Sequence, residues 1–150
     1  MKNLLPIAIL LLIFIACTPK SKTTKTLEEP IYTIIGTWKL VYGEVKENDS
    51  LTVRDVSKAE FIKIINKTHF AYFNQGYQEP RNFYGAGGTY TLKGTTYTEK
   101  LTYTAWEDYR DQSFPFTIEI KKDSLIQHGI EEVKEKGINR YVLEKYVRVP

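Results

Sequence analysis

The chain has 150 residues, of which 42% are apolar and 13% aromatic, and it carries 21 Lys and Arg against 18 Asp and Glu. This apolar and aromatic content can bury a core, which excludes a disordered chain, and the near balance of charge argues against a nucleic-acid-binding protein. The single cysteine excludes an intrachain disulfide bond and a cysteine-based metal cluster.

The first sixteen residues have the pattern of a secretory signal peptide. Lys2 supplies the basic start, the run from Leu4 to Ala16 supplies the apolar region, and the small Ala16 suits a cleavage point. Since a helix needs about 20 apolar residues to cross a bilayer, this run is too short for a transmembrane segment. We therefore expect residues 1–16 to be a lipoprotein or ordinary signal peptide.

Cys17, the only cysteine, follows directly. The sequence Phe14-Ile15-Ala16-Cys17 resembles the lipobox of bacterial lipoproteins, in which the peptidase cuts before the cysteine and the thiol carries a diacylglycerol. The resemblance implies a lipid anchor of palmitate-type chains on Cys17. It also implies a place in the bacterial cell envelope, at the outer membrane facing the periplasm. The alternative is an ordinary signal peptide followed by an incidental or buried thiol.

Residues 17–30 are expected to be the lipidated cysteine and a flexible tether. In residues 18–30 only Leu27 is apolar, so burial could not offset the entropy lost on folding. A flexible tether of this length has a reach of about 20 Å. We expect the folded domain to span residues 31–150.

That domain is predicted to be all-β, because apolar and polar residues alternate and β-branched and aromatic residues are frequent. Eight strands are expected, over residues 36–43, 60–65, 68–74, 88–92, 95–104, 114–121, 124–129 and 139–149. The only helical signal is a short one over residues 51–59.

Short and long connections alternate along the chain. Three are of hairpin size, at Asn66-Lys67, Lys93-Gly94 and Lys122-Asp123, and four are long, over residues 44–59, 75–87, 105–113 and 130–138. Since alternate connections of an antiparallel meander lie at opposite ends, one end is closed by tight turns and the other carries long loops. This predicts an eight-stranded antiparallel up-and-down β-barrel; a two-sheet sandwich is the alternative.

The start of the first strand carries a known pattern. Gly36-Thr37-Trp38 resembles the Gly-x-Trp motif of the lipocalins, in which a basic residue late in the last strand packs over the Trp at the closed end. The strand order independently places the end of the last strand beside Trp38. We expect Arg148 to be that basic residue, with Lys145 as the second choice, so that Gly36, Trp38 and Arg148 form the closed end.

Two further stretches, residues 69–73 and 85–92, resemble lipocalin-like domains of Bacteroidetes-type lipoproteins. The resemblance covers residues 31–150 and implies a lipocalin-like barrel that binds a small molecule. About 120 residues is short for a lipocalin, so we expect a small pocket.

Alternation also predicts which residues line the interior. In residues 95–104 it places Tyr97, Glu99 and Tyr103 on the aromatic, inward face, and two-residue turns would pair Tyr90 with Tyr97, Gly88 with Glu99 and Gln127 with Ile118. The expected ligand-binding residues are Tyr42, Tyr90, Tyr97, Glu99, Tyr103 and Gln127.

The role of Glu99 has two interpretations. A buried carboxylate must be paired, hydrogen-bonded or neutralised, so Glu99 belongs either to a structural network with Lys63 or tyrosine hydroxyls, or to a ligand contact. Alternation does not decide whether Lys63 or His69 points inward from its strand.

No pattern of an active site is present. The two histidines and scattered serines form no nucleophile motif, and residues 85–88 suit a strand bulge better than a phosphate loop because no helix follows. We therefore expect no enzyme, no cofactor and no metal. The barrel is expected to bind a small hydrophobic or amphipathic ligand, with residues 106–111 as either a lid or a plain exposed loop. The alternative is a filled barrel that acts as a protein-interaction module on the cell envelope.

Overall fold

Nine β-strands make up most of residues 33–150, which are the residues that the structure, a computed structural model, describes. The predictions for the signal peptide, Cys17 and the tether lie outside the described residues. The unit from Ile31 to Pro150 is compact, and its described residues complete both the closed barrel and a hydrophobic core, so we expect it to fold without the residues before it. Within the described part of the chain, no helix has the length and apolar character needed to cross a membrane.

Eight of the nine strands follow one another around the barrel in chain order. The nine strands are β1 (Gly36–Glu47), β2 (Ser50–Val53), β3 (Ala59–Ile65), β4 (His69–Gly76), β5 (Phe83–Lys93), β6 (Thr96–Thr104), β7 (Ser113–Lys121), β8 (Ser124–Val133) and β9 (Ile138–Val149). Of these, β2 pairs only with β1. Two short 3₁₀ helices, η1 (Glu107–Tyr109) and η2 (Lys134–Lys136), lie in loops.

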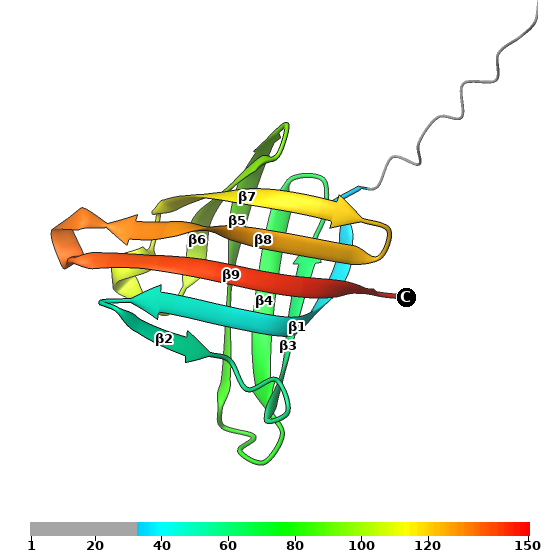
Figure 1. Cartoon of the computed structure of the whole chain (residues 1–150), viewed down its shortest axis with the longest axis horizontal. Coiled ribbons are helices and arrows are strands. Elements are labelled where there is room, and N and C mark those ends of the chain that lie inside the picture. Colours follow the sequence, from blue (N-terminus) through cyan, green and yellow to red (C-terminus); the bar gives the residue numbers. More distant parts are fainter. Residues whose placement is uncertain (1–32) are drawn as a thin grey trace, which may run out of the picture. The chain divides into compact units, whose positions relative to one another are not determined.

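All neighbouring strands are antiparallel, and β9 pairs with β1, which closes an eight-stranded barrel from β1 and β3 to β9. Figure 1 shows β7, β8, β9 and β1 side by side, with β3 to β6 behind them. The prediction of an eight-stranded up-and-down barrel is confirmed, and the pairing of β1 with β9 rules out the open sandwich.

The predicted helix over residues 51–59 is wrong. Ser50–Val53 instead forms β2, which pairs with the end of β1. Asn48 and Asp49 both adopt positive φ angles, of 47° and 62°, as a tight hairpin turn requires. This turn pairs residues 50–53 with the end of β1, so they cannot form a helix. The spacing of apolar residues does not reveal such a turn.

The other turns differ in detail. Lys122 and Asp123 form the expected two-residue turn, with Lys121 paired to Ser124. The β5–β6 turn is Gly94-Thr95 rather than Lys93-Gly94, because Lys93 pairs with Thr96 and Gly94 takes the left-handed conformation, with φ of 59°. This difference of one turn position changes the partner of every residue in the hairpin.

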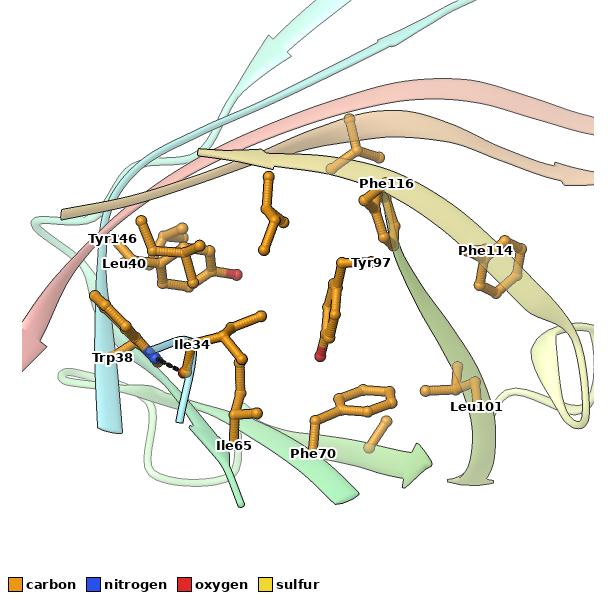
Figure 2. Packing of buried hydrophobic residues seen from close by; sticks show 14 of the residues in the cluster. Ile34, Trp38, Leu40, Ile65, Phe70, Tyr97, Leu101, Phe114, Phe116 and Tyr146 are labelled. Atoms are coloured by element: carbon orange, nitrogen blue, oxygen red, sulfur yellow. Dashed lines mark hydrogen bonds between the residues drawn. The ribbon is translucent and has the colours of Figure 1, made fainter. Parts of the chain in front are cut away.

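The closed end of the barrel is built on Trp38. Its side chain is fully buried, and its Nε1 donates a hydrogen bond to the Ile34 carbonyl at 2.8 Å (Figure 2). Arg148 pairs with Trp38 across the β1–β9 ladder, and its guanidinium carbon lies 4.1 Å from the centre of the Trp38 ring. Arg148 therefore takes the position over the Trp, and Lys145 does not.

Arg148 also fixes the backbone just before β1 through hydrogen bonds. Its Nη1 and Nη2 donate to the carbonyls of Ile35 and Thr33, at 2.9 and 2.8 Å. A Cβ atom at Gly36 would lie 2.2 Å from Arg148 Nη1, and Gly36 has a φ of 152°. The glycine of the motif thus leaves room for the arginine to reach the backbone beyond it.

The hydrophobic core fills the half of the interior nearest this closed end. Figure 2 shows Trp38 and Ile34 at one end of the cluster and Leu101 and Phe114 at the other. Its most deeply buried apolar members are Trp38, Leu40, Ile65, Phe70, Tyr97, Phe116, Leu125 and Tyr146.

We expect Trp38→Ala to lose about 3–5 kcal/mol of unfolding free energy, as removal of a large core aromatic does. Trp106→Ala serves as the comparison, because Trp106 is 41% exposed and its loss should cost much less. Urea denaturation followed by circular dichroism measures both. Equal losses in the two variants would contradict the role of Trp38, as would a red-shifted emission from the Trp38 that remains in Trp106→Ala.

Candidate functional site

A cavity of about 340 Å³ lies inside the barrel, between the core and the loops opposite the closed end. Its walls combine aromatic or apolar side chains with buried charges. The apolar lining residues are Val45, Phe61, Tyr72, Tyr84, Leu101, Trp106, Tyr109, Phe114 and Val142, and the polar ones are Arg54, Lys63, Glu99, Gln127, Glu131, Arg140 and Glu144.

Lys63 lies between the core and this cavity and contacts both. It is 1% exposed, and its Nζ donates to Glu99 Oε1 at 2.8 Å and to Gln127 Oε1 at 2.9 Å. The Nζ also lies 5.4 Å from the centre of the Tyr146 ring and 5.9 Å from that of Tyr97. We call Lys63, Glu99 and Gln127 the Lys63 network. It places two predicted residues, Glu99 and Gln127, together on the cavity wall.

The structure also shows which of Lys63 and His69 points inward. Lys63 does, whereas His69 is exposed and its Nδ1 lies 2.8 Å from Thr68 Oγ1. From alternation alone, either face of these two strands could point inward, and each choice places one polar residue inside, Lys63 or His69. The partners Glu99 and Gln127, which lie on other strands, decide between them.

Burial controls the electrostatics of the Lys63 network. Burial raises the pKa of the Glu99 carboxyl, the positive charge of Lys63 opposes this rise, and the negative charge of Glu144 adds to it. Burial also raises the pKa of Tyr97 well above its ordinary value, and the charge of Glu99 raises it further. The Tyr97 hydroxyl has no hydrogen-bond partner among the described residues, and its ring belongs to the core rather than to the cavity wall.

Tyr42, predicted to line the cavity, instead lies on the outer surface. The pairing of β1 with β9 shifts register between Leu40 and Tyr42, so the alternation that starts at Trp38 reverses. Tyr42 therefore pairs with Lys145, whose Nζ lies 5.0 Å from its ring, and its hydroxyl donates to Glu44.

Tyr103 is also misplaced by the alternation. Its side chain is 65% exposed, because β6 pairs with β7 only over Thr96–Lys100 and beyond that point pairs with β5 alone. The inward face of β6 in the structure consists of Tyr97, Glu99 and Leu101.

Tyr90 lies inside the barrel but away from the cavity. With the turn at Gly94-Thr95 it pairs with Glu99 rather than Tyr97, and its hydroxyl donates to the Asn66 carbonyl at 2.8 Å, near the closed end. Gly88 pairs with Leu101 rather than Glu99 for the same reason, and the ladder shifts register only beyond it, between Gly87 and Gly88. The expected bulge is thus present, and a Cβ at Gly88 would lie 1.8 Å from the Lys100 carbonyl oxygen.

A second ion pair lies nearer the loops and was missed from the sequence. Arg140 Nε and Nη2 both lie 2.6 Å from Glu131 Oε2, and the guanidinium carbon lies 5.1 Å from the centre of the Tyr109 ring. Burial raises the pKa of Glu131, and Arg140 opposes the rise. The sequence predicts a long connection over residues 130–138, but β8 continues to Val133. Because every second residue of a strand lies on the same face, the inward position of Gln127 also predicts an inward Glu131 once β8 is extended.

The loop over residues 106–111 contributes to the cavity wall. Trp106 packs edge-on against Tyr84, with ring centres 5.3 Å apart, and Tyr109 lies 5.9 Å from Phe114. Both loop residues line the cavity. The loop therefore borders the site, as the lid interpretation requires, while Trp106 stays partly exposed.

No match is found in a comparison with known protein families, with curated proteins or with solved structures. Among residues 33–150, no three His, Cys, Asp or Glu side chains gather to hold a metal ion. The residues that line the cavity are therefore the basis for inferring what the barrel does.

We expect Lys63→Met to be strongly destabilised, by about 3–5 kcal/mol near pH 8, because it leaves Glu99 buried without a cation. Burial then raises the pKa of Glu99 further, so the carboxyl is neutral in the folded protein at acid pH. The loss of unfolding free energy relative to the wild type should shrink toward about pH 4. It should grow as the pH rises through the pKa of Glu99 in the folded variant. Urea unfolding across the pH range measures this.

Lys39→Met is the matched control, since Lys39 pairs with Glu60 at 2.7 Å on the surface, where its side chain is 43% exposed. It should change stability little at any pH. A Lys63→Met deficit that does not depend on pH would contradict the buried pairing of Lys63 with Glu99.

Proposed function

We propose that the barrel binds one small amphipathic molecule inside its cavity and performs no reaction on it. The observation that carries this proposal is the coexistence, in one partly open cavity of about 340 Å³, of aromatic walls and charged groups that are buried or half-buried. Ligand pockets typically have volumes of a few hundred Å³, apolar walls and a small number of polar groups that orient the ligand.

The buried charges support binding rather than packing. Lys63 pairs with Glu99 and Arg140 pairs with Glu131, and such pairs give a barrel little net stability because desolvation offsets their attraction. A core filled for stability alone has no use for them. A site that must hold a polar group of a ligand does, because fixed charges in a dry cavity recognise their partners strongly.

We also propose a location for the protein and a family for its barrel. The lipobox-like residues 14–17 support a lipid anchor on Cys17 and attachment to the bacterial cell envelope, at the outer membrane facing the periplasm. The closed barrel, with Arg148 over Trp38 behind Gly36, supports a lipocalin-like family for residues 31–150. The protein is then a tethered carrier or receptor for its ligand.

We expect Val142→Phe to block the site, because Val142 is 5% exposed and faces the cavity. Native mass spectrometry of the unit Ile31–Pro150 purified from its own host should find a bound small molecule on the wild type and none on Val142→Phe. Leu143→Phe, the neighbouring change on the outer face of β9, should retain it.

Folded Val142→Phe that still carries the molecule would contradict binding in the cavity. A wild-type protein that never carries or takes up a small molecule would favour the protein-interaction module instead. Thermal unfolding by circular dichroism shows whether Val142→Phe is folded, and Val142→Leu provides a milder filling of the same space.

We expect Cys17→Ala to remove the anchor. Metabolic labelling with an alkyne fatty acid should mark the wild type and leave Cys17→Ala unmarked, and the variant should leave the membrane fraction, because stable attachment needs the acyl chains. Equal labelling of the two proteins would contradict the lipoprotein proposal without affecting the proposed cavity ligand.

A further inference from the structure

Two of the six charged residues in the cavity have no ionic partner. Lys63 pairs with Glu99 and Arg140 with Glu131, whereas Arg54 and Glu144 form no salt bridge with another described residue. Arg54 Nη1 donates only to the Tyr84 hydroxyl, at 2.5 Å, and Glu144 Oε2 accepts only from the Tyr146 hydroxyl, at 2.6 Å. Glu144 is 8% exposed, so a buried carboxylate is left with one neutral donor.

The fold places both charged residues next to Gly43. Gly43 of β1 pairs with Glu144 of β9, and the Arg54 backbone N–H donates to the Gly43 carbonyl at 2.8 Å. A Cβ at Gly43 would lie 3.5 Å from Arg54 Nε, which is an ordinary contact distance, so the Arg54 side chain lies over Gly43. Arg54 and Glu144 both line the cavity and a smaller pocket that shares part of its wall.

Different side chains engage Arg54 and Glu144. The Arg54 guanidinium carbon lies 5.0 Å from the centre of the Phe61 ring, and its Nη1 donates to the Tyr84 hydroxyl. Glu144 accepts from Tyr146 on its own strand. A cation and an anion that line one cavity without an ionic partner match a ligand that carries both an anion and a cation.

We propose that the cavity takes a free α-amino acid with an apolar or aromatic side chain. Its carboxylate binds the Arg54 guanidinium, whose planar donors suit a carboxylate, and its ammonium group binds Glu144. The side chain packs against the apolar wall formed by Phe61, Tyr72 and Leu101. This inference rests on the proposed function and names the ligand class of the same cavity.

Three ligands with the same phenyl–ethyl frame separate the two charged contacts. L-phenylalanine carries both groups, phenethylamine lacks the carboxylate, and 3-phenylpropionate lacks the ammonium. Isothermal titration of the unit Ile31–Pro150 should show L-phenylalanine binding at least about tenfold more tightly than either analogue, which is the loss expected for one missing charged contact. L-leucine should also bind, since the wall is apolar rather than specific for a ring.

The variants assign each contact. Arg54→Gln should remove the preference for L-phenylalanine over phenethylamine, and Glu144→Gln should remove the preference over 3-phenylpropionate. Arg81→Gln and Glu135→Gln change exposed residues outside the cavity and should leave all affinities unchanged. Circular dichroism checks that each variant is folded.

Equal binding of L-phenylalanine and one analogue by the wild type would overturn the recognition of the missing group. Failure of both L-phenylalanine and L-leucine to bind would overturn the ligand class. Neither result touches the proposed function, which the Val142→Phe comparison tests separately through the molecule found on the purified protein.

Discussion

The pairing of β9 with β1 is the constraint on which the rest of the structure depends. It closes the barrel and sets which residues face each other across the seam. At one end it places Arg148 over Trp38, and further along it places Gly43 opposite Glu144. The register shift between Leu40 and Tyr42 lies between these two points. Without that shift, the alternation from Trp38 would place Tyr42 in the interior and Gly43 on the outer face.

The Lys63 network separates a packed half of the barrel from a hollow half. Toward the closed end, Lys63 lies against the rings of Phe70, Tyr97 and Tyr146, and toward the loops it meets the cavity through Glu99 and Gln127. A buried ion pair adds little stability compared with apolar packing. Its presence is therefore better explained by the polar surface that it gives the cavity than by the fold.

The sequence predicts the barrel well because strand alternation and short turns are local signals. All eight barrel strands, and Glu99 and Gln127 inside, follow from them. The position of Arg148 over Trp38 was expected from the resemblance of Gly36-Thr37-Trp38 to the Gly-x-Trp motif, together with the strand order. The errors at Tyr42, Tyr90 and Tyr103 share another origin: a register shift, a turn moved by one residue, and the end of a neighbouring strand are set by pairing between strands. Arg54 and Glu131 were missed because β2 and the last part of β8 depend on the same pairing.

Charge balance inside the barrel constrains the occupant further. The cavity holds three cations, Arg54, Lys63 and Arg140, against three carboxylates, Glu99, Glu131 and Glu144. After burial, the mutual repulsion of these carboxylates contributes to the raised pKa values of Glu99 and Glu131. A ligand with a net charge would add an uncompensated charge to this partly buried space, which is costly. A ligand with equal and opposite charges leaves the balance intact and supplies Arg54 and Glu144 with the partners that they lack, so the same argument that disfavours ions favours a zwitterion.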